Sequence, residues 1–293
     1  MPELPEVETV KRGLQRLLPK HCIKQVDISW NKSFLVNNKD LKNYVLGSKV
    51  TKVTRRGKLL IIELDSKHSL LIHLKMTGQL VFRGEDNFGA GHPTDSLVGE
   101  LPDKSTRVVF VFDDGSRLFF NDQRKFGWIK LLLTANVNSF DFIKRLGPEP
   151  LGNKITSSLF IEQLNKRQNS GVKSVLLDQS IVAGIGNIYA DEALFLSGIH
   201  PSLRIRDIAT SKKIELFNAI QEVLQLSIDN GGSSDRNYVD AHGNKGSYLG
   251  FAKVFRREGL PCPKCGTTII KLRVAGRGTH ICPHEQKLPK GYK

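Results

Sequence analysis

Apolar and polar residues change period along this chain, and the change divides it into segments. Residues 5–18 carry an apolar stripe at helical spacing, formed by Val7, Val10, Leu14 and Leu17. Between residues 23 and 135 the apolar residues fall instead in short strand-like runs: Lys58–Leu64, Ser69–Leu74, Arg107–Phe112 and Arg117–Asn121. Asp113-Asp114-Gly115 joins the last two runs and predicts a tight hairpin. Many short strands after one helix predict a β-sandwich or barrel-like domain.

Beyond residue 150 the period becomes helical. Leu146-Gly147-Pro148-Glu149-Pro150 is typical of a linker, and the apolar spacing after it predicts helices over 157–167, 172–182, 187–197 and 209–229. Two stretches rich in glycine and polar residues, 84–104 and 231–250, predict long mobile loops. Strands at Thr268–Val274 and Thr279–Cys282, around Ala275-Gly276-Arg277-Gly278, predict a terminal hairpin.

These segments predict an α+β protein with an N-terminal helix, a β-sandwich, a helical domain and a C-terminal β-hairpin. We place the β domain with its leading helix at 1–145 and the linker at 146–152. The helical domain follows at 153–259 and includes the loop 231–250, and the hairpin with a basic tail occupies 260–293.

The charge of the chain points to a polyanionic partner. Lysine and arginine number 44 against 29 acidic residues, a formal charge of +15 over 293 residues. Nucleic acid is the expected partner of such a surface, and an anionic membrane is its rival. We see no apolar run long enough to span a bilayer and no secretion signal, so we predict a cytoplasmic protein that does not bind membranes.

The first residues carry candidate chemistry. If Met1 is removed, Pro2 presents a secondary amine directly before the carboxylate of Glu3. Such an amine can attack an electrophilic carbon and form an iminium, and a neighbouring carboxylate can move the protons. Proline and glutamate also suit the first turn of a helix, which is the alternative reading of the same residues.

Three of the four cysteines cluster near the C-terminus, and the isolated Cys22 is expected to be a buried free thiol. Cys262, Cys265 and Cys282 fit the zinc pattern C-x2-C…C-x2-C except at its last position, where Glu285 stands. A structural zinc ion with His284 or Glu285 as fourth ligand is therefore one interpretation, and His280 is a third candidate. The other interpretation is a hairpin that has lost its metal.

Several motifs together resemble one enzyme family. Residues 2–10 (PELPEVETV), followed by Arg12-Gly13-Leu14, resemble the start of the bacterial formamidopyrimidine-DNA glycosylases, which excise oxidised purines. The related endonuclease VIII branch typically has glycine in place of Leu4. Further similar motifs follow in the family's order: Arg55–Lys58, His73–Gly78, Asp122–Gly127, Ala183–Glu192 and Ala275–Thr279.

The resemblance implies a bifunctional glycosylase and AP lyase that acts on duplex DNA carrying oxidised purines or abasic sites, as a monomer. It implies that the β domain is catalytic, that a helix–two-turn–helix lies in 153–259, that 231–250 caps the lesion, and that the hairpin is a zinc finger. Pro2 would attack the sugar, Glu3 would transfer protons and Glu6 would organise the site. Lys58 and Arg277 would grip phosphates at the active site.

By the same resemblance, Met76, Arg124 and Phe126 would fill the gap left by a flipped nucleotide, as base-processing enzymes require. His73, Lys173 and Asn187 would complete the DNA contacts. The chain departs from the family at Ser105, at Phe119-Phe120 and at the missing fourth cysteine. Two rival functions remain: a non-enzymatic module that binds damaged DNA, and an endonuclease VIII-like preference for oxidised pyrimidines.

Overall fold

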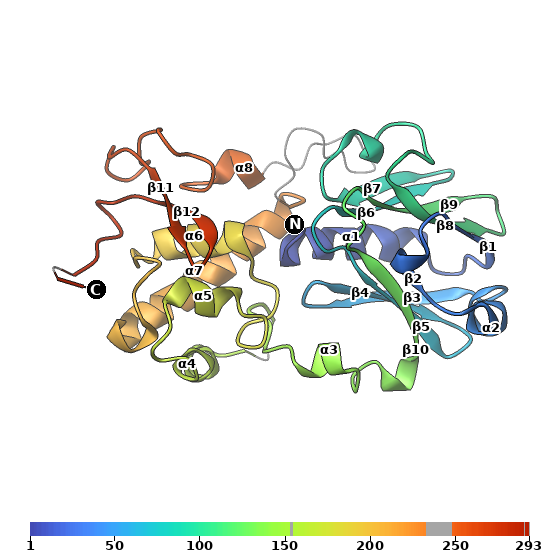
Figure 1. Cartoon of the computed structure of the whole chain (residues 1–293), viewed down its shortest axis with the longest axis horizontal. Helices are drawn as coiled ribbons and strands as arrows, with labels where there is room; N and C mark the ends of the chain where they lie inside the picture. Colours follow the sequence, from blue (N-terminus) through green and yellow to red (C-terminus); the bar gives the residue numbers. More distant parts are fainter. Residues whose placement is uncertain (153–154, 233–247, 290, 293) are drawn as a thin grey trace. The chain divides into compact units, whose positions relative to one another are not determined.

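The computed structural model describes residues 1–152, 155–232, 248–289 and 291–292 (Figure 1). The chain forms two compact units. The first contains Met1–Lys144 together with the segment that begins at Asn230, and the second contains Arg145–Asp229 and the chain from Tyr248 onward. The division lies beside the predicted linker at 146–152.

The first unit opens with α1 (Leu4–Leu17), which confirms the predicted helix to within one residue. The apolar stripe predicted from the sequence faces inward, since Val7, Val10 and Leu14 are fully buried. Glu3 is the N-cap residue, and Pro5 stands in the first turn, where its missing N–H costs nothing.

Two five-stranded sheets follow and form the predicted β-sandwich. One has the order β1-β8-β9-β6-β7, with bounds Ile23–Ile28, Thr106–Phe112, Arg117–Asp122, Gly78–Arg83 and Asn87–Gly91. The other has the order β2-β10-β5-β4-β3, with bounds Phe34–Leu35, Trp128–Leu133, His68–His73, Leu59–Leu64 and Val50–Arg56. The hairpin predicted at Asp113–Gly115 joins β8 to β9, and Gly115 supplies its positive φ of 83°.

Helix α1 packs against β7 and β3, the last strands of the two sheets, and runs along the sandwich between them (Figure 1). The approach to β7 is close, because a Cβ on Gly13 would lie 2.1 Å from the Phe88 ring. On the other side, the Gln15 side chain accepts the Val53 N–H at 2.5 Å. The helix thus covers one open side of the sandwich and satisfies part of an exposed strand edge.

We predicted a mobile loop over the whole of 84–104, and the structure shows ordered elements in this stretch. It contains β7, which pairs antiparallel with β6, and a short 3-10 turn at Asp95–Leu97. Phe88 and Ala90 are buried in the core of the sandwich, which offsets the glycines that suggested a loop.

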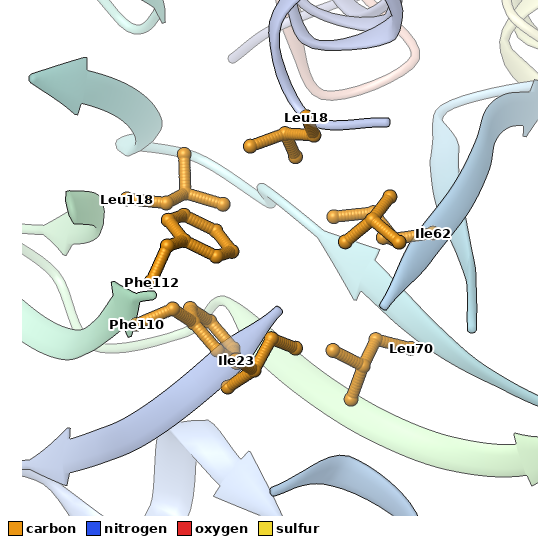
Figure 2. Close-up of a pocket in the computed structure, with 8 residues that line it drawn as sticks. Leu18, Ile23, Ile62, Leu70, Phe110, Phe112 and Leu118 are labelled. Atoms are coloured by element: carbon orange, nitrogen blue, oxygen red, sulfur yellow. The ribbon is translucent and has the colours of Figure 1, made fainter. Parts of the chain in front are cut away.

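A small cavity lies in this core and is lined by apolar side chains from α1's end and from both sheets (Figure 2). Phe110, Phe112 and Leu118 face it from the first sheet, and Ile62 and Leu70 from the second. With no polar group to hold water or a ligand, it is a packing gap and not a binding site.

The second unit is helical. Its helices are α4 (Ser157–Asn165), α5 (Val172–Leu177), α6 (Asn187–Leu196), α7 (Thr210–Asp229) and α8 (Tyr248–Phe251). Helix α6 lies at the centre and packs against α5 and α7. The helix predicted over 172–182 ends early, because Asp178 is extended and accepts the Ser180 N–H. None of the described helices is both long and apolar enough to cross a bilayer.

The loop predicted at 231–250 is tested only at its ends. Residues 233–247 lie outside the described residues. Tyr248 is buried and begins α8, so the loop ends earlier than predicted. Its ring lies 5.3 Å from that of Tyr189, which attaches α8 to α6.

The terminal hairpin consists of β11 (Ile270–Val274) and β12 (Arg277–Ile281). Its turn is shorter than predicted. Ala275 and Gly276 alone form it, with φ values of 50° and 72°, and Arg277 already pairs with Val274. Arg277 and Gly278 therefore belong to β12, which packs against α6.

Candidate active site

The chain terminus holds two buried carboxylates beside Pro2. Glu3 and Glu6 are 3% and 5% exposed, and Pro2 is buried in a chain that still carries Met1. The Glu3 N–H donates to Glu6 Oε2 at 2.7 Å, and the Glu3 carboxylate accepts the Glu6 backbone N–H in return. This capping box fixes both carboxylates and begins the helix. The catalytic interpretation of these residues and their interpretation as the start of a helix are therefore compatible, because the capping box begins α1 and also holds both carboxylates beside Pro2.

Gly232 lies against the Glu6 side chain. Its φ is +94°, and a Cβ at this position would lie 3.3 Å from Glu6 Cγ and Oε1. Only glycine adopts this backbone conformation without strain and leaves room for the Glu6 side chain. The segment after α7 therefore contacts Glu6 through the backbone of Gly232.

Lys58 occupies the turn between β3 and β4 and is only 8% exposed. It lies near His73 at the end of β5, since Leu59 pairs with His73 in the sheet. Burial, together with the charges of Lys75 and Lys58, lowers the pKa of His73 to about 3. The ring is therefore neutral near pH 7, and its Nδ1 accepts the Lys75 N–H at 3.0 Å. This hydrogen bond fixes the backbone at Lys75, directly before Met76.

Two loops of the first unit, hereafter the β unit, carry the residues that we predicted to enter the duplex. Met76 is half-buried, Arg124 is exposed and Phe126 is 54% exposed. The Arg124 guanidinium lies 4.9 Å from the centroid of the Phe126 ring, a cation–π contact. The residues before them, Lys75 and Lys125, have φ values of 51° and 60°. Such left-handed conformations cost free energy and persist where the surroundings enforce them.

Asp122, which we did not single out, holds these two loops together. It is fully buried, and its Oδ1 accepts from the Thr77 hydroxyl and, at 3.2 Å, from the Arg124 N–H. Its Oδ2 accepts the Gly127 N–H at 2.7 Å. One carboxylate thus joins the loop of Met76 to the loop of Arg124 and Phe126. Its burial could not be read from the sequence, because it depends on segments that meet only in the fold.

In the second, helical unit, Asn187 is the first residue of α6 and does not cap the helix. Gly186 is the N-cap residue, and the Asn187 amide donates instead to Gly278 O at 3.0 Å. The contact ties the start of α6 to the residue after Arg277, whose side chain is exposed. Asn187 therefore lies beside the strand β12 that carries Arg277, and the phosphate contacts of both residues stay predictions.

Lys173, which the resemblance places among the DNA contacts, lies in a buried network. Its side chain is fully buried, and Nζ donates to Asp191 Oδ1 at 2.5 Å and to Thr279 Oγ1 at 2.7 Å. Asp191 Oδ2 accepts the His280 N–H at 2.9 Å. The lysine thus fastens β12 to α5 and α6.

Glu192, the residue after Asp191, anchors the segment that precedes β11. Glu192 is buried, and its carboxylate accepts the N–H groups of Lys253, Val254 and Phe255 at 2.8, 3.0 and 2.8 Å. Desolvation raises its pKa despite these bonds. Asp191 thus holds β12, and the adjacent Glu192 holds the segment before β11. We did not predict this role for either residue.

The three clustered cysteines meet as predicted. The sulfurs of Cys262, Cys265 and Cys282 lie within 4.8 Å of one another, and the last two are 3.5 Å apart. That is too long for a disulfide and close to the spacing of about 3.8 Å between sulfurs on a tetrahedral zinc with bonds of about 2.3 Å. Hydrogen bonding with Thr267 lowers the pKa of Cys265 to about 7, which favours the thiolate that a metal needs.

His280 is not a fourth ligand. Its ring contacts Asp191 Oδ2 at 3.3 Å and Glu258 Oε2 at 3.1 Å, and it lies in neither group of clustered ligand atoms. His284 and Glu285 do lie with Cys265 in such a group.

The departures from the family pattern also have a structural setting. Phe119 and Phe120 are buried in the sandwich core, and Phe120 packs against Gly127. Ser105 is buried and donates its backbone and hydroxyl to Asp103 at 2.8 and 2.7 Å.

Family models match the chain in three places. The formamidopyrimidine-DNA glycosylase N-terminal domain matches residues 1–129, the H2TH domain of the same enzymes matches 146–238, and the zinc finger found in FPG and IleRS matches 259–284.

Individual relatives and solved structures agree with these matches. The formamidopyrimidine-DNA glycosylase of Pelotomaculum thermopropionicum is 40% identical over 98% of this chain and 100% of its own length, and that of Pediococcus pentosaceus is 39% identical with the same coverage. A mutant Lactococcus lactis enzyme in complex with Fapy-dG DNA has a TM-score of 0.87 and 34% identity, covering 98% of this chain and 100% of its own. The enzyme of that organism with abasic-site DNA has a TM-score of 0.86 and 35% identity at the same coverage. The chain therefore belongs to the formamidopyrimidine-DNA glycosylase family and is a DNA-repair glycosylase.

Proposed function

We propose that this glycosylase removes oxidised purines, namely 8-oxoguanine and formamidopyrimidines, from duplex DNA and then cleaves the abasic site by β,δ-elimination. The observation that carries the proposal is the pair of buried carboxylates, Glu3 and Glu6, locked together beside Pro2 at the start of α1. Similar solved structures contain Fapy-dG or abasic-site DNA, and the charge of +15 suits a DNA ligand.

The reaction uses the amine that removal of Met1 creates. The Pro2 nitrogen donates its lone pair to C1′ of the deoxyribose, and the bond from C1′ to the base breaks as the base takes up a proton. The amine then loses its own proton, and the C1′–O4′ bond breaks as O4′ takes up a proton, which leaves an open-chain iminium. Glu3 transfers these protons. Glu6 holds Glu3 in place through the capping box.

The iminium then drives strand cleavage. It acidifies C2′, so loss of that proton expels the 3′ phosphate, and loss of a C4′ proton then expels the 5′ phosphate. Hydrolysis of the final iminium releases the sugar fragment and regenerates the amine.

Extraction of the base needs residues that enter the duplex. Phe126 and Met76 are apolar side chains on adjacent loops, and an exposed Phe126 has no core to fill. Arg124, stacked on Phe126, can satisfy the orphaned partner base. Arg277 and Asn187, and Lys58 in the β unit, would contact the phosphates, whereas His73 and Lys173 act by holding neighbouring groups.

The cysteines would hold a structural zinc ion. The three sulfurs fit a tetrahedral site, and the zinc-finger model spans them. When bound, zinc contributes folding free energy to the hairpin and takes no part in the proposed chemistry.

Covalent trapping tests the mechanism. Borohydride should reduce the iminium and link the processed enzyme to a duplex that contains 8-oxoguanine. Pro2→Gly should trap weakly because a primary amine remains, and protein that retains Met1 should neither trap nor cleave. Intact-mass spectrometry establishes which terminus each sample carries. Strand cleavage by a sample with Met1 retained would refute the role of Pro2.

Oxidised pyrimidines are a second candidate substrate class. A similar structure, with a TM-score of 0.85 and 34% identity, is the Lactococcus lactis enzyme with oxidised-pyrimidine DNA. A panel of duplexes with one lesion each separates the two classes, and we expect faster excision from the purine lesions. Salt-sensitive binding without any cleavage would instead indicate a non-catalytic binder of damaged DNA.

A further inference from the structure

The two ends of the zinc-finger-like hairpin carry the same local sequence. Cys262-Pro263-Lys264-Cys265 precedes β11, and Cys282-Pro283-His284-Glu285 follows β12. The second segment repeats the first with histidine in place of lysine and glutamate in place of the second cysteine.

The repeat is also structural. In the first turn the Gly266 N–H donates to Cys262 O at 2.9 Å, and in the second the Gln286 N–H donates to Cys282 O at 3.0 Å. Both backbones close the same five-residue turn after a Cys-Pro step. Glu285 therefore stands where the first turn places its second cysteine, and His284 stands where it places the exposed Lys264.

Side-chain positions follow this correspondence. A carboxylate oxygen of Glu285 lies within 4.8 Å of the Cys265 sulfur, and Cys265 in turn belongs to the group of three thiols. The Glu285 side chain is 26% exposed and that of His284 is 56% exposed. The His284 Nδ1 contacts Glu285 Oε1 at 3.2 Å, as an imidazole that orients a ligating carboxylate would.

We infer that Glu285 is the fourth ligand of a zinc ion held by Cys262, Cys265 and Cys282, and that His284 orients its carboxylate. Zinc accepts carboxylate oxygen beside thiolate sulfur. One carboxylate and three thiolates carry the same total charge as four thiolates, so the replacement keeps the electrostatic balance of the site. The inference rests on the zinc site of the proposed function and is independent of the chemistry at Pro2.

Metal affinity tests the assignment without recourse to activity. We would measure zinc content of the full-length protein by native mass spectrometry, and affinity by competition with a chromophoric chelator. Glu285→Gln should lower the affinity at least tenfold, and His284→Ala should lower it less. Glu285→Cys should restore tight binding. Far-UV circular dichroism shows whether each variant is folded.

Cobalt substitution gives an independent readout. The sulfur-to-cobalt charge-transfer band should reflect three thiolates in the wild type and in Glu285→Gln, and should gain about one third in Glu285→Cys. A zinc affinity unchanged in Glu285→Gln would overturn the assignment. In that case, weaker zinc binding by His284→Ala would identify the imidazole as the fourth ligand. Unchanged affinity in both variants would identify a water molecule instead. A wild type without zinc would refute the metal site itself, whereas trapping on DNA would still test the catalytic proposal.

Discussion

At the scale of single residues, the proposed site divides by exposure. Glu3, Glu6, Asp122, Lys173 and Asp191 are all buried charged groups with polar partners, and a buried charge persists only where such partners hold it. The exposed side chains of Arg124, Phe126 and Arg277 are the ones available to a ligand. Asp122, Lys173 and Asp191 therefore hold neighbouring segments in place, and the exposed side chains are accessible to DNA.

His73 should make the β unit sensitive to acid. Its pKa is about 3 in the folded protein, so between that value and the unfolded value of about 6.5 only the unfolded chain takes up the proton. The stability that the neutral ring contributes is complete above about pH 6.5 and declines as pH falls.

From pH 7.5 to pH 5, the wild type should lose about 2 kcal/mol more unfolding free energy than His73→Asn, which keeps an acceptor for the Lys75 N–H. Urea titration followed by tryptophan fluorescence measures this, because both tryptophans, Trp30 and Trp128, lie in the β unit. Parallel pH curves for the two proteins would show that His73 is not held neutral.

Lys173→Met should destabilise the helical unit by about 3–5 kcal/mol, because it leaves the Asp191 carboxylate buried without its cation. Lys212→Met, which breaks the exposed pair with Glu215, should cost less than about 1 kcal/mol. Urea unfolding followed by far-UV circular dichroism compares the two. Equal effects would mean that the Lys173 ammonium is hydrated and not enclosed.

At the scale of elements, buried carboxylates join segments that are distant in sequence. Asp122 joins the loop between β5 and β6 to the loop between β9 and β10. Asp191 and Glu192, adjacent on α6, hold β12 and the segment before β11. The functional loops and the hairpin are thus positioned by the elements beneath them.

Asp122→Asn should loosen the intercalating loops, since its amide nitrogen replaces one of the two carboxylate oxygens and cannot accept the hydrogen bonds of that oxygen. We expect about 1–3 kcal/mol of lost stability in the β unit. Excision of 8-oxoguanine should fall at least tenfold, with a smaller effect on cleavage of a preformed abasic site, where no base has to be extracted. Gln123→Ala, exposed in the same loop, is the matched control. Equal losses on the two substrates would argue against a role in base extraction.

At the scale of the whole molecule, the charge of +15 should dominate DNA affinity. The logarithm of the binding constant should fall linearly with the logarithm of salt concentration. Arg277→Ala should make this slope shallower by about 1, as loss of one phosphate contact predicts. Fluorescence anisotropy with an abasic-analogue duplex measures the slope, with Lys39→Ala, an exposed lysine of the β unit, as the control. An unchanged slope for Arg277→Ala would remove Arg277 from the phosphate contacts.

The sequence alone was sufficient for the order of elements, because each rests on local periodicity. The stripe of α1, the strand runs and the hairpin at Asp113–Gly115 were all predicted close to their true bounds. The cysteine cluster followed from spacing in the same way. Errors came where tertiary contacts override composition, as at β7, where burial of Phe88 outweighs a glycine-rich, polar stretch.

Only the tertiary structure decided which charged residues are enclosed and what they hold. Nothing in the local sequence distinguishes the buried Lys173 from an exposed lysine, because burial depends on elements that arrive from elsewhere in the chain. The same holds for Asp122, which accepts from Thr77, 45 residues away, and for Asp191, which accepts from His280, 89 residues away. Local propensity depends on neighbours in sequence, whereas the cost of burying a charge depends on neighbours in space.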